Sequence, residues 1–141
     1  MDISFSKEGE EYRQQVREWL KMNIPKVKNR NFNDQENIEW ERKLYEGGYA
    51  GITWPKEYGG QGLDIEKQII FNEECGKLDA PGGMNGIGKA ILGPTLLELG
   101  TEEQKRRFIP GIIKGEISFA IGYSEPNAGT DLANLQTRAE L

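Results

Sequence analysis

A polar loop near residue 130 holds the side chains of this 141-residue sequence that are best suited to bind a small molecule. Ser124 and Thr130 carry hydroxyl groups that can each donate and accept a hydrogen bond. Gly129 allows a ligand to approach the backbone closely. Hydroxyls and exposed amides around a glycine suit a flat polar heterocycle or a carbonyl group. An ordered turn that Asp131 caps, and that binds nothing, is the alternative interpretation of the same residues.

Other kinds of chemistry are excluded by what the sequence lacks. It contains no histidine and a single cysteine, Cys75, so a zinc site, a histidine-dependent triad and an intrachain disulfide are not expected. The loop also lacks the Gly-Lys-Ser/Thr ending of a phosphate-binding Walker motif. Any reaction must therefore depend on carboxylates, hydroxyls, backbone amides or a cofactor.

Five helices are predicted before this loop. Apolar residues at helical spacing and polar capping residues place them at 5–22, from Asp34 to Gly47, from Asp64 to Leu78, at 84–99 and from Thr101 to Gly115. Thr101 and Gln104 form a capping-box pattern. Pro94 should kink or restart the fourth helix, and Pro110 should divide the fifth, because proline cannot donate to the helical ladder.

The spacing of apolar residues changes after the fifth helix. Residues 116–123 alternate apolar with small or polar side chains, which predicts one β-strand. A single strand cannot satisfy its own edges. We therefore expect an all-α, up-and-down helical domain at 1–115 and the opening of a truncated sheet domain at 116–141.

The bulk properties favour a soluble protein of the cytoplasm. The net charge of −5 is opposite to that of a typical nucleic-acid-binding surface, so no nucleic-acid partner is expected. The first residues have neither the basic start nor the apolar core of a signal peptide, and no apolar run is long enough to span a membrane.

Three segments resemble one enzyme family. The loop GYSEPNAGTDLAN resembles the signature segment of the acyl-CoA dehydrogenases, in which Tyr123 replaces a residue that is more often aliphatic. WPKEYGGQGLD resembles the loop between the family's second and third helices, and GTEEQKRRFIPGIIKGE resembles the segment before its first sheet strand. The resemblance covers nearly the whole chain, but only the N-terminal helical domain and the first strand of the middle domain of that family.

The resemblance implies an FAD site built from this loop. It places Ile121, Gly122 and Tyr123 along the isoalloxazine ring and Ser124 near flavin N5 and O4. Gly129 and Thr130 would complete the flavin contacts, and Thr130 would also touch the acyl-CoA substrate.

The implied reaction is oxidation of the α,β bond of an acyl-CoA thioester to the 2-enoyl-CoA. The family's catalytic base comes from its C-terminal domain, so no catalytic residue is expected here, and Glu125 should be a structural part of the turn. Residues 91–97 are expected to be helical core, or alternatively a wall of the acyl pocket. The resemblance also implies an electron-transfer flavoprotein-type acceptor and a homo- or hetero-tetrameric parent protein.

Two alternatives stay open at this point. An acyl-CoA oxidase would share the fold and pass its electrons to oxygen, and a non-catalytic helical module would bind a partner through residues 116–123. Since one loop cannot enclose a flavin, we expect the 141 residues alone to bind FAD weakly or not at all and to lack activity.

Overall fold

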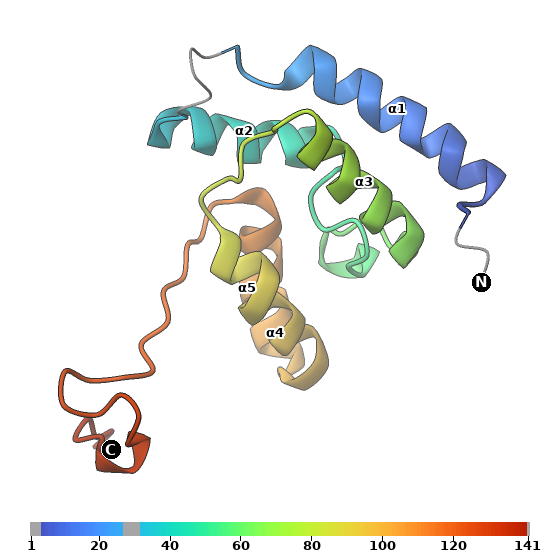
Figure 1. The fold of residues 1–141 in the computed structure, drawn as a ribbon. Coiled ribbons are helices and arrows are strands. Elements are labelled where there is room, and N and C mark those ends of the chain that lie inside the picture. Colours follow the sequence, from blue (N-terminus) through green and yellow to red (C-terminus); the bar gives the residue numbers. More distant parts are fainter. Residues whose placement is uncertain (1–3, 27–31, 141) are drawn as a thin grey trace.

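The computed structural model describes residues 4–26 and 32–140 and shows a helical body from which the C-terminal segment extends (Figure 1). Its helical elements, in chain order, are α1 (Lys7–Asn23), α2 (Asp34–Glu46), the 3-10 turn η2 (Lys56–Tyr58), α3 (Ile65–Lys77), the π-helix η3 (Gly88–Leu92), α4 (Gly93–Leu99), α5 (Glu102–Lys114) and the 3-10 turn η4 (Leu132–Asn134). The prediction of an all-α domain of about five helices is confirmed. No helix within the described ranges is long and apolar enough to cross a membrane.

Caps predicted from the sequence fix several helix ends. The Thr101 hydroxyl accepts the N–H of Gln104 at 3.2 Å, and the Gln104 side chain accepts the N–H of Thr101 at 2.9 Å, which completes the capping box of α5. Gly115 then ends α5 with a left-handed φ of 73°. In α2 the cap is Asn33 rather than Asp34, one residue earlier than predicted.

The two prolines act differently from one another. Before Pro94 the helix takes the π pattern, in which the N–H of Gly93 donates to the carbonyl of Gly88, and α4 restarts with Pro94 in its first turn. That prediction is confirmed. The prediction that Pro110 divides the fifth helix is wrong: α5 runs through it without a break. The helix tolerates the lost hydrogen bond because Ile109, Ile112 and Ile113 are all buried on its inner side.

The core lies where α1, α2, α3 and α5 meet. Its buried apolar side chains are Val16, Leu20, Trp40, Leu44, Ala50, Ile52, Tyr58, Phe71, Ile109 and Ile113. Aromatic rings reinforce it, with Tyr49 stacked on Phe71 at 5.3 Å between ring centroids. The loop between α2 and α3 contributes Ala50, Ile52 and Tyr58, so it is part of the packed body.

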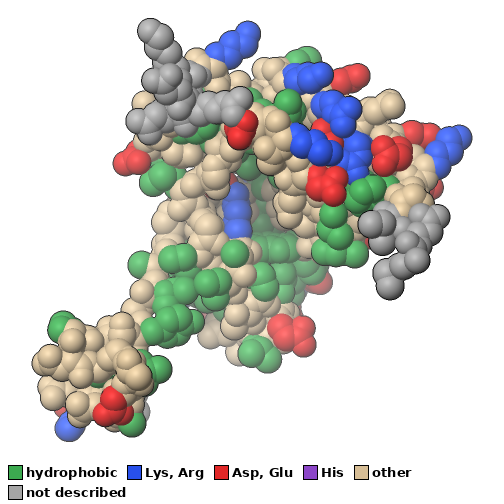
Figure 2. Space-filling model, in the orientation of Figure 1, with side chains coloured by type: hydrophobic (Ala, Val, Ile, Leu, Met, Phe, Trp, Pro, Cys, Tyr) green, Lys and Arg blue, Asp and Glu red, His purple; other side chains and the backbone are tan. Residues whose placement is uncertain are grey.

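Ion pairs connect α1 to α3. The carboxylate of Glu74, 1% exposed, accepts hydrogen bonds from Arg13 at 2.9 Å, from Arg17 at 2.7 Å and from Lys77 at 3.1 Å. Figure 2 shows basic and acidic side chains interspersed over this part of the surface. Since three cations surround one buried carboxylate, its charge is compensated.

The predicted strand at 116–123 is not formed. Among the described residues these are extended but unpaired, and the only ladder contact is an isolated bridge between Glu125 and Ala128. The strand is absent because no neighbouring segment in the described ranges offers hydrogen bonds to its edge.

Candidate functional site

An apolar groove separates the fourth helical segment from the extended C-terminal chain. Its volume is about 380 Å³, and it is lined by Ile87, Ile91, Leu92, Thr95, Phe119, Ala120, Ile121 and Tyr123. We call it the C-terminal groove. Figure 2 shows hydrophobic side chains gathered where the C-terminal segment leaves the helical body.

Packing on α5 positions the C-terminal side of the groove. Ile117 lies so close to α5 that a Cβ added at Gly111 would be 2.4 Å from its Cδ1, so a larger residue there would displace the Ile117 side chain. The rings of Phe108 and Phe119 meet edge to face with 6.3 Å between their centroids. These two contacts hold the start of the extended chain against α5 and direct residues 119–123 toward η3 and α4.

The structure brings two of the six predicted flavin contacts into the groove. Ile121 and Tyr123 line it, and both are exposed. Gly122, Ser124, Gly129 and Thr130 are also exposed, but they do not line the groove. The predicted residues therefore form one accessible surface beside an apolar groove rather than an enclosed pocket.

Glu125 closes the loop that follows. Its carboxylate accepts the backbone N–H of Gln136 at 2.9 Å and of Thr137 at 2.7 Å, together with the hydroxyl of Thr137. These hydrogen bonds, above all the one from the Thr137 hydroxyl, lower the pKa of Glu125. The prediction that Glu125 is a structural part of the turn is confirmed. Asp131, in contrast, makes no side-chain cap for η4.

The loop has both the room and the donors that a flat heterocycle requires. A Cβ added at Gly122 or at Gly129 would meet no atom within 4 Å, so a planar ring can lie against the backbone there. Within the described part of the chain, the hydroxyls of Ser124 and Thr130 have no hydrogen-bond partner. A flavin has an apolar face and polar edge atoms, and the residues present fit those two requirements.

Sequence reasoning found only part of the helical wall. It offered residues 91–97 as a wall or as core, and the structure divides that range: Ile91 and Leu92 line the groove, whereas Leu96 and Leu97 pack against the core. Thr95, inside the same range, also lines the groove, and only Ile87 lies outside the range that was offered. The spacing of Ile87, Ile91 and Thr95 by four residues could have identified them as one face.

No metal centre is apparent in the described ranges, since no three His, Cys, Asp or Glu side chains are grouped to hold an ion. The site thus offers an apolar groove, free hydroxyls and open backbone. These are features of a site for an organic molecule.

Comparisons with known proteins agree with these features. Residues 6–116 match the family described as acyl-CoA dehydrogenase, N-terminal domain. Acyl-CoA dehydrogenase IpdE1 of Mycolicibacterium smegmatis is 40% identical over 95% of this chain and 37% of its own length. The short-chain-specific acyl-CoA dehydrogenase of Clostridium acetobutylicum is 37% identical over 100% of this chain and 38% of its own length.

Solved structures show the same relationship in three dimensions. The Tcur3481-Tcur3483 steroid ACAD superimposes with a TM-score of 0.78 at 39% identity, over 98% of this chain and 37% of that one. The ChsE4-ChsE5 complex of Mycobacterium tuberculosis gives a TM-score of 0.75 at 38% identity, over 97% of this chain and 35% of that one. The chain spans little more than a third of the length of these relatives, and it belongs to the acyl-CoA dehydrogenase family through that family's N-terminal domain.

Proposed function

We propose that this chain is the N-terminal portion of an FAD-dependent acyl-CoA dehydrogenase, which oxidises the α,β bond of an acyl-CoA thioester to the 2-enoyl-CoA. In this proposal residues 1–115 form the helical domain and 116–141 open a middle β domain. The observation that supports it most is the C-terminal groove, in which Ile121 and Tyr123 face Ile87 and Ile91 of the helical body.

FAD bound beside this groove would accept the hydride that leaves the β carbon of the substrate. The chain's own contribution is to orient the reactants and to exclude water. Ile121, Gly122 and Tyr123 would lie along the isoalloxazine ring. The Ser124 hydroxyl would donate toward flavin N5 and O4, where negative charge develops, and a positioned donor there lowers the barrier.

The loop also supplies the substrate contact. Gly129 and Thr130 would complete the flavin contacts, and Thr130 would touch the acyl-CoA. Glu125 is occupied by Gln136 and Thr137, so the base that removes the α proton is assigned to the remainder of the protein. We further propose a tetrameric parent protein of the cytoplasm with an electron-transfer flavoprotein as acceptor. The proposed assembly of several chains fits the hetero-complex among the structural relatives.

A chimera tests the activity. This chain replaces the matched segment of the M. smegmatis relative, and acyl-CoA-dependent reduction of a dye is measured. We expect the chimera to be active and Ser124→Ala to lower kcat by about tenfold to a hundredfold, because one donor to a developing charge is lost. Asn127→Ala, in the same exposed loop, is the control that should leave kcat unchanged.

Two results would count against the proposal. One is a folded chimera that reduces no dye while the parental M. smegmatis enzyme does. The other is a gene with a stop codon directly after Leu141, which would favour the non-catalytic helical module.

A further inference from the structure

An ion pair between α2 and η3 lies behind the helical wall of the C-terminal groove. Nζ of Lys89, on η3, donates to Oε2 of Glu41, on α2. The Glu41 side chain is 4% exposed, and that of Lys89 is partly buried. The backbone closes over Glu41, since a Cβ added at Gly83 would overlap its Oε1 and one added at Gly115 would be 2.8 Å from its Cβ. The carboxylate is therefore held in one place, directed at η3.

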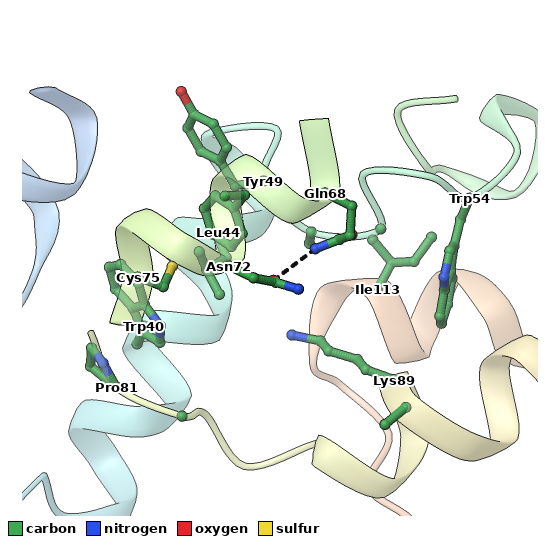
Figure 3. A pocket seen from close by; sticks show the side chains of 15 residues that line it. Trp40, Leu44, Tyr49, Trp54, Gln68, Asn72, Cys75, Pro81, Lys89 and Ile113 are labelled. Carbon is green, nitrogen blue, oxygen red and sulfur yellow. Dashed lines mark hydrogen bonds between the residues drawn. The ribbon is translucent and has the colours of Figure 1, made fainter. Parts of the chain in front are cut away.

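A second polar anchor lies four residues earlier in the chain. Asn85 is 2% exposed and donates from Nδ2 to the carbonyl oxygen of Ile112, on α5, at 3.2 Å. The N–H of Lys89 donates to the carbonyl oxygen of Asn85 at 3.0 Å, so one helical turn carries both anchors. Figure 3 shows the Lys89 side chain extending from η3 toward α2 and α3, with the indole of Trp54 beside the same helical segment. The start of this segment is thus attached to both α2 and α5.

The side chains that line the groove lie on the other face of the segment. Ile87 and Ile91 each follow one of the two anchored residues by two positions, and two residues make roughly half a helical turn. Neither anchored residue lines the groove. Any rotation of the anchored face therefore rotates the groove face as well.

The register of η3 decides how this face is turned relative to α4. In the π pattern the N–H of Gly93 donates to the carbonyl of Gly88, so the turn contains one residue more than an α-helical turn. A change to the α pattern would rotate Ile87 by about 100° relative to Thr95 and separate them on the surface. Because π segments are rare, contacts at both ends must hold this one. Packing of Trp54 against Gly93 holds the C-terminal end.

Stability alone does not account for a buried ion pair at this position. Desolvation of two charges offsets most of their attraction, and apolar side chains of similar size are often at least as stable in the same place. An ion pair adds direction, because the amine and the carboxylate must meet at hydrogen-bonding distance and angle. The pair between α2 and η3 therefore constrains the orientation of η3.

We infer that Glu41 and Lys89 are positioning residues, whose ion pair holds η3 in the π register and thereby sets the wall that the C-terminal groove presents to a ligand. The register concerns the fold of this chain alone. The effect on the ligand rests on the proposed function, in which the groove lies beside the acyl group of an acyl-CoA.

Scalar coupling across hydrogen bonds, measured by NMR, tests the register in the 141-residue chain. In the unaltered chain the amide nitrogen of Gly93 should couple to the carbonyl carbon of Gly88. Glu41→Met is combined with Lys89→Met, because either change alone would leave a charge buried and unpaired. In this double variant we expect the coupling to move to the carbonyl of residue 89 or to disappear. The midpoint of urea unfolding should not fall.

Two further variants separate the buried pair from general effects. Lys89→Arg keeps a cation that can bind Glu41, so it should keep the coupling between residues 88 and 93. Arg42→Met combined with Glu46→Met removes an exposed ion pair of α2 with an N–O distance of 2.7 Å. Because exposed pairs contribute little, this control should change neither the coupling nor the midpoint.

The chimera with the M. smegmatis relative tests the effect on the groove. It is assayed with whichever of butyryl-CoA, octanoyl-CoA and cyclohexanecarbonyl-CoA it oxidises best. In the double variant at Glu41 and Lys89 we expect KM to rise about tenfold and kcat to stay within about twofold, because contacts with the acyl group are lost while the donor at Ser124 is unchanged. The control at Arg42 and Glu46 should leave both constants unchanged.

Four results would overturn the inference. They are absence of the coupling between residues 88 and 93 in the unaltered chain, its persistence in the folded double variant at Glu41 and Lys89, failure of that variant to fold, and loss of the coupling with an unchanged KM. Failure to fold would make the pair a requirement for stability rather than for register. An unaltered chimera that oxidises no acyl-CoA would count against the proposed function instead, since the coupling in the isolated chain still decides the register.

Discussion

The indole of Trp54 occupies the space in which a side chain at residue 93 would lie. A Cβ added at Gly93 would be 2.1 Å from Cη2 of Trp54 and 2.9 Å from the carbonyl oxygen of Gly88. Gly93 is buried and joins η3 to α4. The contact therefore fixes the loop after α2 against the helical segment that borders the C-terminal groove.

This contact predicts that Gly93→Ala is destabilising. The added methyl overlaps the indole and the backbone of η3, and overpacking of this kind costs about 1–3 kcal/mol. The midpoint of urea unfolding should therefore fall. Gly76→Ala is the matched control: a Cβ there meets no atom within 4 Å, and alanine favours the helix, so stability should rise. Equal effects of the two substitutions would refute the packing argument.

The buried carboxylate of Glu74 predicts sensitivity to acid. Hydrogen bonds from Arg17, and then from Arg13 and Lys77, lower the pKa of Glu74 to about 2, although burial acts in the opposite direction. A carboxyl whose pKa is depressed by folding stabilises the protein fully above its unfolded pKa. That stability is lost as the pH falls from about 5 toward 2.

Glu74→Gln tests this directly. It should lower the free energy of unfolding at pH 7 by about 3 kcal/mol, because Arg13 loses its buried partner, and it should flatten the fall in stability between pH 5 and 2. Glu73→Gln, at an exposed carboxylate that also pairs with Arg13, should have a smaller effect. Urea unfolding at several pH values measures both variants, and an unchanged pH profile for Glu74→Gln would contradict the assignment.

The only thiol of the chain, Cys75, is half-buried and has a raised pKa. Burial, assisted by the charge of Glu74, raises the pKa of Cys75 to about 12, so the reactive thiolate is scarce at neutral pH. We expect Cys75 to react with a thiol reagent at least about a hundredfold more slowly in the native chain than in denaturant. A native rate close to the denatured rate would show that Cys75 is open to solvent.

The capping box of α5 predicts a modest loss of stability when it is broken. Thr101→Ala removes the hydroxyl that accepts the N–H of Gln104 and should destabilise the chain by about 1 kcal/mol. Thr101→Ser keeps the acceptor and should retain most of that stability. Thermal unfolding of the two variants separates loss of the cap from loss of the methyl group.

Local signals predicted most of the helices, and long-range packing accounts for the errors. The caps at Thr101 and Asp64, and the restart at Pro94, depend on neighbouring residues and could be read directly from the sequence. The prediction that Pro110 divides the fifth helix was wrong because burial of Ile109, Ile112 and Ile113 outweighs one lost hydrogen bond. This burial depends on the packing of α5 against α2 and against the loop before α3. The prediction of a strand at 116–123 was wrong for a similar reason, since a strand must form hydrogen bonds with a segment that is distant in the sequence.

The site was predictable only in part. Resemblance identified Ile121 and Tyr123, but the groove that they form depends on Ile87 and Thr95, more than 20 residues earlier in the chain.

The most direct test of the account is the flavin content of two proteins, measured by visible absorbance after purification with added FAD. The first is the 141-residue chain, and the second is its chimera with the remainder of the M. smegmatis relative, with that relative as the positive control. The account predicts no bound flavin in the folded isolated chain and one flavin per chain in the chimera, because residues 121–130 form only one side of the site. Tight, stoichiometric FAD binding by the isolated chain, or a folded chimera without flavin, would contradict it.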